Sequence, residues 1–194
     1  RATVFSTEVR LPVRVAASSR RGYAIQNMTQ IAAFRAAMAA RQRQVVMIRR
    51  FGPPPGRHPY RLRPGAYAVL IRDGQALLTF QHQPEPEFQL PGGGIDPGES
   101  PLAALHREVR EETGWTIATP RRLGAYRRYC YMPDYGFWAE KLCSVWLARP
   151  VARRSPPLEP GHEARWLPLT DAARWLPEPG MRAFFHLALA RLQT

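Results

Sequence analysis

Three glutamates in the middle of the chain have a spacing that could bind a cation. Glu108, Glu111 and Glu112 lie three and four positions apart, so on a helix their carboxylates would share one face. Like charges at this spacing repel each other. A hard divalent cation such as Mg²⁺ removes the repulsion, because it prefers oxygen ligands and leaves coordination positions for substrate phosphates. The spacing therefore indicates a magnesium site for a phosphorylated molecule.

Neighbouring residues suit the same chemistry. Arg107 can pair with a carboxylate through two hydrogen bonds and hold it in place. The glycine run 92–94 permits positive φ angles and a close approach of the backbone to a diphosphate. The alternative is a solvated helix face whose acids pair with Arg107 and Arg110. For two adjacent glutamates alone we would favour that alternative, but the full set of residues favours the metal site.

Local signals place these glutamates on a helix. Ser100 is a suitable N-cap, Pro101 suits the first helical position and Gly114 ends the helix, which predicts a helix over residues 101–113. Asp73-Gly74 indicates a hairpin between apolar runs at 66–72 and 75–81. We expect further strands at 87–90, 115–118, 121–131, 137–149 and 164–169, and helices at 171–176 and 181–192. Strands around one helix with helices at the end predict an α/β/α sandwich.

The stretch from Gly93 to Trp115 resembles the Nudix box. Its residues agree with that motif at every specified position: Gly93, Glu99, Arg107-Glu108-Val109, Glu111-Glu112 and Gly114-Trp115. The resemblance in architecture covers residues 61–194. It implies an α/β fold, the Nudix α/β/α sandwich with a mixed central sheet and a loop–helix–loop catalytic motif. It also implies Mg²⁺-dependent hydrolysis of a diphosphate linkage in a nucleoside diphosphate derivative, with Mn²⁺ as an alternative cation.

The resemblance also implies roles for individual residues. Glu108 and Glu112 would be metal ligands, and Glu111 would be a ligand or part of the apparatus that activates water. Glu99 would support the metal site and Arg107 would orient the carboxylates. Gly93 and Gly94 would lie against the diphosphate.

The general base in this family is often a glutamate outside the box. Glu159 and Glu163 occupy the corresponding region, with Glu163 as the first choice, and Glu140 lies where related sugar-diphosphate hydrolases also carry a glutamate. Each of the three could equally be a surface acid. His162 has suitable chemistry for a base, but a solvated loop histidine is the simpler interpretation.

The substrate is less well defined by the sequence. Tyr131 suits stacking on a base, as in dinucleoside-polyphosphate hydrolases, whereas the segment 133–141, which includes Glu140, resembles nucleoside-diphosphate-sugar hydrolases. We favour an ADP-ribose-like or sugar-nucleotide substrate. The alternatives are a dinucleoside-polyphosphate or RNA 5′-pyrophosphate hydrolase and a non-catalytic regulatory module. The complete set of four box glutamates argues against the module.

Charge divides the chain in two. Residues 1–60 contain 11 arginines and one acid, a net charge of +10, whereas residues 61–194 carry +3. The Pro-rich stretch 51–59 is a linker by composition, so we expect a basic extension over 1–60, with a helix at 30–44, and a Nudix domain over 61–194. The extension could bind nucleic acid, target an organelle, or reflect an over-extended gene start, since Met47 opens a more ordinary sequence.

Three further expectations concern the surroundings of the protein. No stretch approaches the ~20 apolar residues of a membrane span, and we expect a cytoplasmic protein, with organelle targeting as the alternative. Cys130 and Cys143 fit no metal-ligand spacing and are expected to be buried free thiols rather than a disulfide. The expected partner is a small nucleotide diphosphate, and a homodimer and nucleic acid are further candidates.

Overall fold

The computed structural model describes residues 48–83 and 85–193. The helix expected at 30–44 lies outside these residues. The elements follow one another along the chain in the order β1 (Arg49–Arg50), β2 (Tyr60–Arg72), β3 (Gln75–Gln81), β4 (Glu87–Gln89), β5 (Gly92–Gly94), α2 (Pro101–Thr113), β6 (Trp115–Met132), a 3-10 turn (Pro133–Tyr135), β7 (Phe137–Arg153), β8 (His162–Pro168), α3 (Leu169–Trp175) and α4 (Pro179–Leu192).

One mixed sheet of eight strands links these elements. Its main order is β1-β6-β7-β2-β3-β4, with β5 paired to β2 and β8 paired to β3. Strand β2 runs parallel to β7 over Tyr60–Leu70. Along its other edge β2 pairs first with β5, at Gly65–Tyr67, and then with β3, at Leu70–Arg72. The glycine run therefore hydrogen-bonds to the middle of the sheet.

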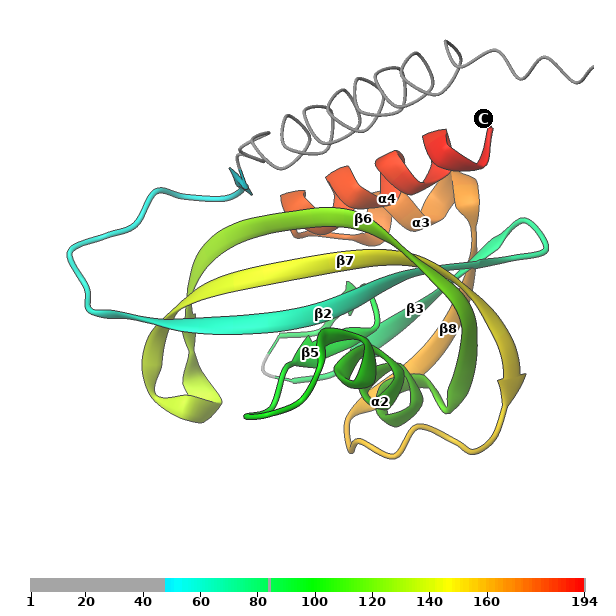
Figure 1. The fold of residues 1–194 in the computed structure, drawn as a ribbon, viewed down its shortest axis with the longest axis horizontal. Coiled ribbons are helices and arrows are strands. Elements are labelled where there is room, and N and C mark those ends of the chain that lie inside the picture. The colour runs from blue at the N-terminus through cyan, green and yellow to red at the C-terminus, as the bar shows by residue number, and fades with distance from the viewer. Residues whose placement is uncertain (1–47, 84, 194) are drawn as a thin grey trace, which may run out of the picture. The chain divides into compact units, whose positions relative to one another are not determined.

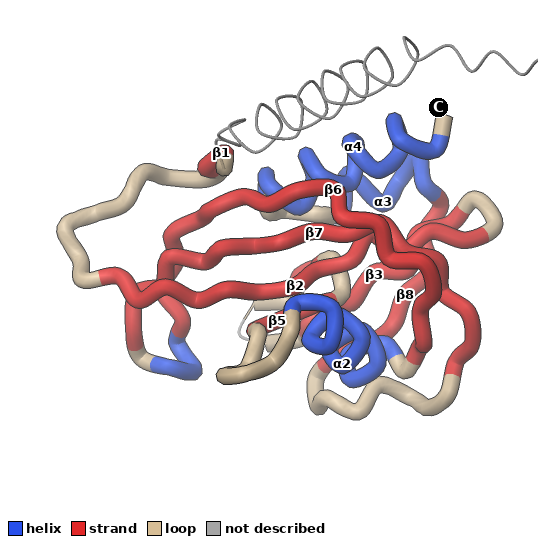
Figure 2. The backbone as a smooth tube through the Cα atoms, viewed as in Figure 1, coloured by secondary structure: helices blue, strands red, loops and turns tan. Residues whose placement is uncertain are grey.

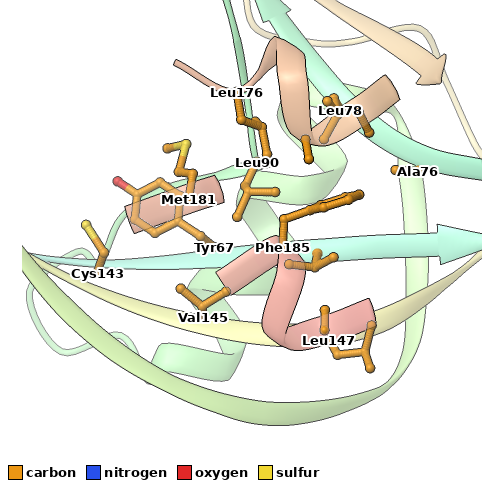
Figure 3. Packing of buried hydrophobic residues seen from close by; sticks show 14 of the residues in the cluster. Tyr67, Ala76, Leu78, Leu90, Cys143, Val145, Leu147, Leu176, Met181 and Phe185 are labelled. Carbon is orange, nitrogen blue, oxygen red and sulfur yellow. The ribbon is translucent and has the colours of Figure 1, made fainter. Parts of the chain in front are cut away.

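Helices cover both faces of this sheet, with α2 on one side and α3 and α4 on the other (Figures 1 and 2). Alternate residues of β2 point to opposite faces: Ala66, Ala68 and Leu70 pack with α2, whereas Tyr67 and Val69 pack with α3 and α4 (Figure 3). Over residues 65–70, where both faces are buried, β2 is apolar without alternation. The expected α/β/α sandwich with a mixed sheet is confirmed.

Helix α2 begins and ends where the sequence predicts. The Ser100 hydroxyl accepts a hydrogen bond from the Ala103 N–H at 3.2 Å, and Pro101 opens the helix. Gly114 adopts the left-handed conformation, with a φ of 75°. A Cβ at this glycine would lie 2.0 Å from the Ser155 carbonyl oxygen, so no other residue fits. The ends of α2, and thus the phase of its carboxylate face, are fixed.

Several boundaries differ from those expected. The strands expected at 115–118 and 121–131 form one strand, β6, whose register against β7 shifts between Thr116 and Gly124. The glycine run, expected as a loop, is strand β5. Helix α4 begins at Pro179, two residues early, because the Glu178 carboxylate caps it by accepting hydrogen bonds from the Gly180 and Met181 N–H groups.

The folded unit starts before the Pro-rich stretch. Its first described residue is Ile48. Strand β1 pairs with β6, the Phe51 N–H donates to the Arg127 carbonyl at 2.9 Å, and the Phe51 ring meets Tyr126 edge-on at 5.6 Å. The division into an extension over 1–60 and a domain over 61–194 stays a prediction, but Phe51 packs with the domain.

Two smaller expectations can be compared with the described residues. Cys143 is buried and Cys130 is half-buried, and both are free thiols. None of the helices in residues 48–83 and 85–193 has the length and apolar content needed to cross a membrane.

Candidate functional site

A cleft of about 740 Å³ opens beside the glycine strand β5. Its size suits a nucleotide. Carboxylates of α2 form one wall, the loop before β8 adds Glu159, and the first residue of β8 adds His162. Strands β2 and β7 contribute Arg63, Tyr67 and Lys141. The lining also includes the backbone of Gly92, Gly93 and Gly94, the amides of Gln81, Gln83 and Gln89, and Asp96, Arg107, Met132 and Tyr135.

Glu112 lies at the inner end of the carboxylate wall and is 7% exposed. Its Oε2 atom accepts hydrogen bonds from the Gly92 N–H at 2.9 Å and from the Thr79 hydroxyl at 3.1 Å. Burial raises the pKa of Glu112 to about 8, and the neighbouring Glu108 charge contributes to the rise. These hydrogen bonds fix the carboxyl group, while burial makes its ionised form unstable unless a cation lies nearby.

The position of the Glu108 carboxylate depends on the absence of a side chain at Gly93. The Glu108 side chain is 9% exposed, and burial raises its pKa. A Cβ atom built on Gly93 would lie 2.5 Å from Glu108 Oε2 and 2.8 Å from Oε1. The absence of a side chain at position 93 thus allows the carboxylate to lie directly against the backbone of β5.

Arg107 connects the other carboxylates. Its Nε and Nη2 atoms donate to the two oxygens of Glu99 at 3.0 and 2.8 Å, and Nη1 donates to Glu108 at 2.8 Å and to Glu111 at 3.0 Å. Nη2 also donates to the Gly94 carbonyl at 3.0 Å. The hydrogen bonds from Arg107 lower the pKa of Glu99. Arg107 thus hydrogen-bonds to three carboxylates of this group.

A second set of ligand atoms faces Glu112 from the first residue of β8 and the loop before it. One ligand atom each from Glu112, Glu159 and His162 lie within 4.8 Å of one another. His162 Nε2 is 3.9 Å from Glu112 Oε1, and its buried Nδ1, which has no hydrogen-bond partner, is 3.7 Å from Glu159 Oε2. The loop is attached to α2, because the Leu158 and Glu159 N–H groups donate to the Glu111 carbonyl. The cleft thus gathers carboxylates and one imidazole.

Four residues expected near the site lie outside the cleft lining, and one of them, Glu99, contacts it through Arg107. Glu163 is exposed and pairs with His82, at 2.8 Å, and with Arg165, and the hydrogen bond from His82 lowers its pKa. Glu140 pairs with Arg127 at 2.9 Å. Tyr131 is 49% exposed and packs beside Trp138.

The structure adds cleft residues that the sequence did not reveal. Tyr135, in the 3-10 turn, lines the cleft where Tyr131 was expected, and Arg63 and Lys141 supply positive charge. The clearest overlooked signal is in β2 and β7. Arg63 and Lys141 are register partners on the parallel strands, so two cations lie at the same level just before the apolar parts of both strands.

Comparisons with known proteins agree with the fold. Residues 61–188 match the model of the NUDIX domain family. A MutT NUDIX hydrolase from Burkholderia pseudomallei superposes with a TM-score of 0.52 over 66% of this chain and 98% of its own, at 26% identity. A MutT protein from Methanosarcina mazei gives 0.55 over 70% and 98%, at 23% identity.

Similar sequences carry several names. A putative 8-oxo-dGTP diphosphatase of Bacillus subtilis is 39% identical over 33% of this chain and 43% of its own length. An RNA pyrophosphohydrolase of Halorhodospira halophila is 39% identical over 34% and 37%. A CMP-linked phosphonate hydrolase of Streptomyces rubellomurinus is 29% identical over 61% and 58%. The matched regions span less than two-thirds of these relatives.

Proposed function

Because the chain belongs to the NUDIX domain family, we propose that it hydrolyses a diphosphate linkage in a nucleoside diphosphate derivative with the help of a divalent cation. The observation that carries the proposal is the pair of buried carboxylates, Glu108 and Glu112, on the cleft side of α2. Burying two like charges is costly. A cation that bridges them to a substrate phosphate would offset this cost.

The donor set fits Mg²⁺. Glu108 and Glu112 would hold the ion, with Glu111 as a further ligand and Glu99 acting through Arg107. Oxygen donors predominate, as Mg²⁺ requires, and the His162 imidazole next to Glu112 also suits Mn²⁺. When bound, the ion would neutralise the diphosphate and stabilise charge in the transition state of phosphoryl transfer.

The chain also offers a base for the attacking water. We propose Glu159, because it lines the cleft and lies in the cluster with Glu112 and His162. A base must lie within reach of the water from which it takes a proton. Glu163, the first choice from the sequence, lies outside the cleft lining, and its carboxylate is engaged by His82 and Arg165. Backbone hydrogen bonds to Glu111 hold the Glu159 loop against the metal-binding helix.

The nucleotide would lie along the cleft from the carboxylate wall toward Tyr135. The rings of Tyr67 and Tyr135 provide apolar surface, and Gln81, Gln83 and Gln89 provide amide groups that can read the edge of a base. An ADP-ribose-like or sugar-nucleotide substrate and a polyphosphate substrate both contain the required linkage. The names of the relatives include triphosphate and RNA substrates.

A phosphate-release assay over a panel of nucleotides tests this function, with chromatography of the products for those members whose hydrolysis yields only phosphate esters or inorganic diphosphate. We expect turnover of at least one member of a set that contains ADP-ribose, sugar nucleotides, dinucleoside polyphosphates, nucleoside triphosphates and 5′-triphosphorylated RNA. Activity should require added Mg²⁺ or Mn²⁺ and disappear in excess chelator. Turnover that is undiminished in chelator would contradict the metal-dependent mechanism. Binding of these nucleotides without turnover of any would favour the regulatory module.

We also propose that residues 1–46 are dispensable for hydrolysis of small nucleotides. A chain that begins at Met47 keeps strand β1 and Phe51, and we expect a melting temperature and kcat close to those of the full chain. A chain that begins at Arg61 loses the β1–β6 pairing and the contact of Phe51 with Tyr126, so its melting temperature should fall by several degrees. Thermal denaturation and the phosphate-release assay of both chains check the boundary. Equal stability of the two would place the boundary at 61 after all.

A further inference from the structure

Two half-buried cations lie side by side, one lining the cleft and the other next to it. Arg128 on β6 and Lys141 on β7 are direct cross-strand partners in the antiparallel pair, so both side chains leave the same face of the sheet. Neither is fully exposed, and like charges in this position destabilise a sheet. Neither forms an ion pair with any carboxylate among the side chains that the structure describes. The fold alone gives no reason for this pair of charges.

The charge of the Glu178 carboxylate acts on Arg128 but forms no ion pair with it, so the two cations are neutralised only in part. Lys141 Nζ lies 5.6 Å from the centre of the Tyr67 ring, and burial raises the pKa of that tyrosine, so it is a neutral phenol at pH 7. The carboxylate of Glu178 is occupied by the Tyr126 hydroxyl and by the N-terminus of α4. The buried Nε of Arg128 has no hydrogen-bond partner.

A third cation extends this positive region toward the metal-binding wall. Arg63 is the register partner of Lys141 on β2, and both line the cleft. Its guanidinium lies beside Gly94, since a Cβ there would meet Nη2 at 2.9 Å, and it stacks on the Tyr135 ring at 5.1 Å. Arg63 also forms no ion pair with the described carboxylates. The carbonyl of Gly94 accepts from Arg107, so the positive region begins where the carboxylate wall ends.

The cleft therefore has two ends of opposite charge. Glutamates and a cation would hold one diphosphate, whereas Arg63 and Lys141 face the same space without a counter-ion. Ammonium and guanidinium groups that are partly removed from water bind phosphate oxygens strongly. A sugar such as the ribose of ADP-ribose carries no charge to place there.

We propose that Arg63 and Lys141 bind an additional phosphate group of the substrate, so that the preferred substrates are nucleotides with three or more phosphates. This inference rests on the proposed function, because it assigns the diphosphate to the carboxylate end of the same cleft. It favours polyphosphates over the sugar nucleotides. Arg128, behind Lys141, adds to the positive potential of this end.

Binding of two non-hydrolysable nucleotides in the presence of Mg²⁺ tests the proposal. The probes are α,β-methylene-ADP and α,β:β,γ-bismethylene-ATP, measured by isothermal titration calorimetry on the full chain. We expect the triphosphate analogue to bind about tenfold more tightly or better, the order expected for one additional charge-assisted contact. In Lys141→Gln the preference should fall to about twofold or less, with the diphosphate analogue little affected. Arg63→Gln should reduce the preference in the same direction.

A matched control separates the local contact from net charge. Arg149 is an exposed residue of β7 outside the cleft lining, so Arg149→Gln removes one charge from the same strand and should keep the wild-type preference. Should Lys141→Gln fail to fold, as judged by circular dichroism, Arg63→Gln decides the question by the same criterion. Equal affinity of the wild type for both analogues, or an unchanged preference in the variants, would overturn the inference.

The result is separable from the proposed hydrolysis, since the assay measures binding only. A triphosphate preference that depends on Lys141, in a protein that hydrolyses no nucleotide of the panel, would support the phosphate site and reject the hydrolase. Turnover of ADP-ribose together with equal binding of the two analogues would support the hydrolase and reject the phosphate site.

Discussion

Replacing Glu112 by Gln should lower kcat by about a hundredfold or more and, in the metal-free protein, raise the melting temperature. The two effects have one cause. Glu112 is buried against Gly92 and Thr79, where a carboxylate without a cation is poorly solvated. Glutamine has the same shape, and its carbonyl oxygen can accept both hydrogen bonds. The variant thus loses a metal ligand without losing its place in the fold.

The effect on stability should depend on pH in a defined direction. Burial raises the pKa of Glu112 to about 8 in the folded protein, above its ordinary value of 4.5. Between these values the folded state binds more protons than the unfolded state, so wild-type stability falls as pH rises from about 4.5 through 8. Glutamine does not titrate. The advantage of Glu112→Gln should therefore be small at pH 5 and reach roughly 5 °C above pH 8.

Melting temperatures at pH 5 and 8.5, each in chelator and in saturating Mg²⁺, check this prediction. Mg²⁺ should stabilise the wild type more than the variant, because only the wild type keeps the full ligand set. Glu163→Gln is the matched control: it removes an exposed carboxylate whose pKa is lowered, so it should not stabilise the protein at pH 8.5. A Glu112→Gln protein that is less stable than wild type in chelator at pH 8.5 would show that the buried, ionised carboxylate does not destabilise the fold.

The parts of the site that the sequence predicts are those that local spacing determines. Helix α2 begins at Pro101 and ends before Gly114 because its caps are local, and the i, i+3 and i+4 positions then place Glu108, Glu111 and Glu112 on one face. The hairpin at Asp73-Gly74 is equally local. The order of strands and helices along the chain predicts the layers of the fold.

Residues that are brought together by strand register could not be predicted in the same way. Glu163 and His162 are neighbours, yet only His162 lines the cleft, because successive residues of a strand point to opposite sides. Excluding Glu163, the first choice from the sequence, required knowing where β8 begins and which of its residues face the cleft. Arg63, Arg128 and Lys141 come from three strands whose alignment includes register shifts in β6. Tyr135 replaces Tyr131 at the cleft because a 3-10 turn follows β6.

Replacing Glu159 by Gln should lower kcat by ~10²–10⁴ at saturating Mg²⁺ with little change in KM, as expected when a general base is removed and substrate binding is kept. Glu159 lines the cleft, and its carboxylate lies 3.7 Å from His162 Nδ1. Its backbone is attached to Glu111, so the substitution should leave the loop in place. Steady-state kinetics on the best substrate of the panel measure both constants.

Glu163→Gln provides the comparison for kinetics as well, because it removes a carboxylate four residues away that lies outside the cleft lining. We expect its kcat to remain within about threefold of wild type, since it loses only exposed contacts with His82 and Arg165. A large loss in Glu163→Gln and none in Glu159→Gln would show that the loop rearranges when substrate binds. Near-wild-type rates for both variants would show that neither residue is the general base. Glu111 or the metal itself would then activate the water. Only a loss confined to Glu159→Gln, at unchanged KM, fits a base on the cleft side of this loop.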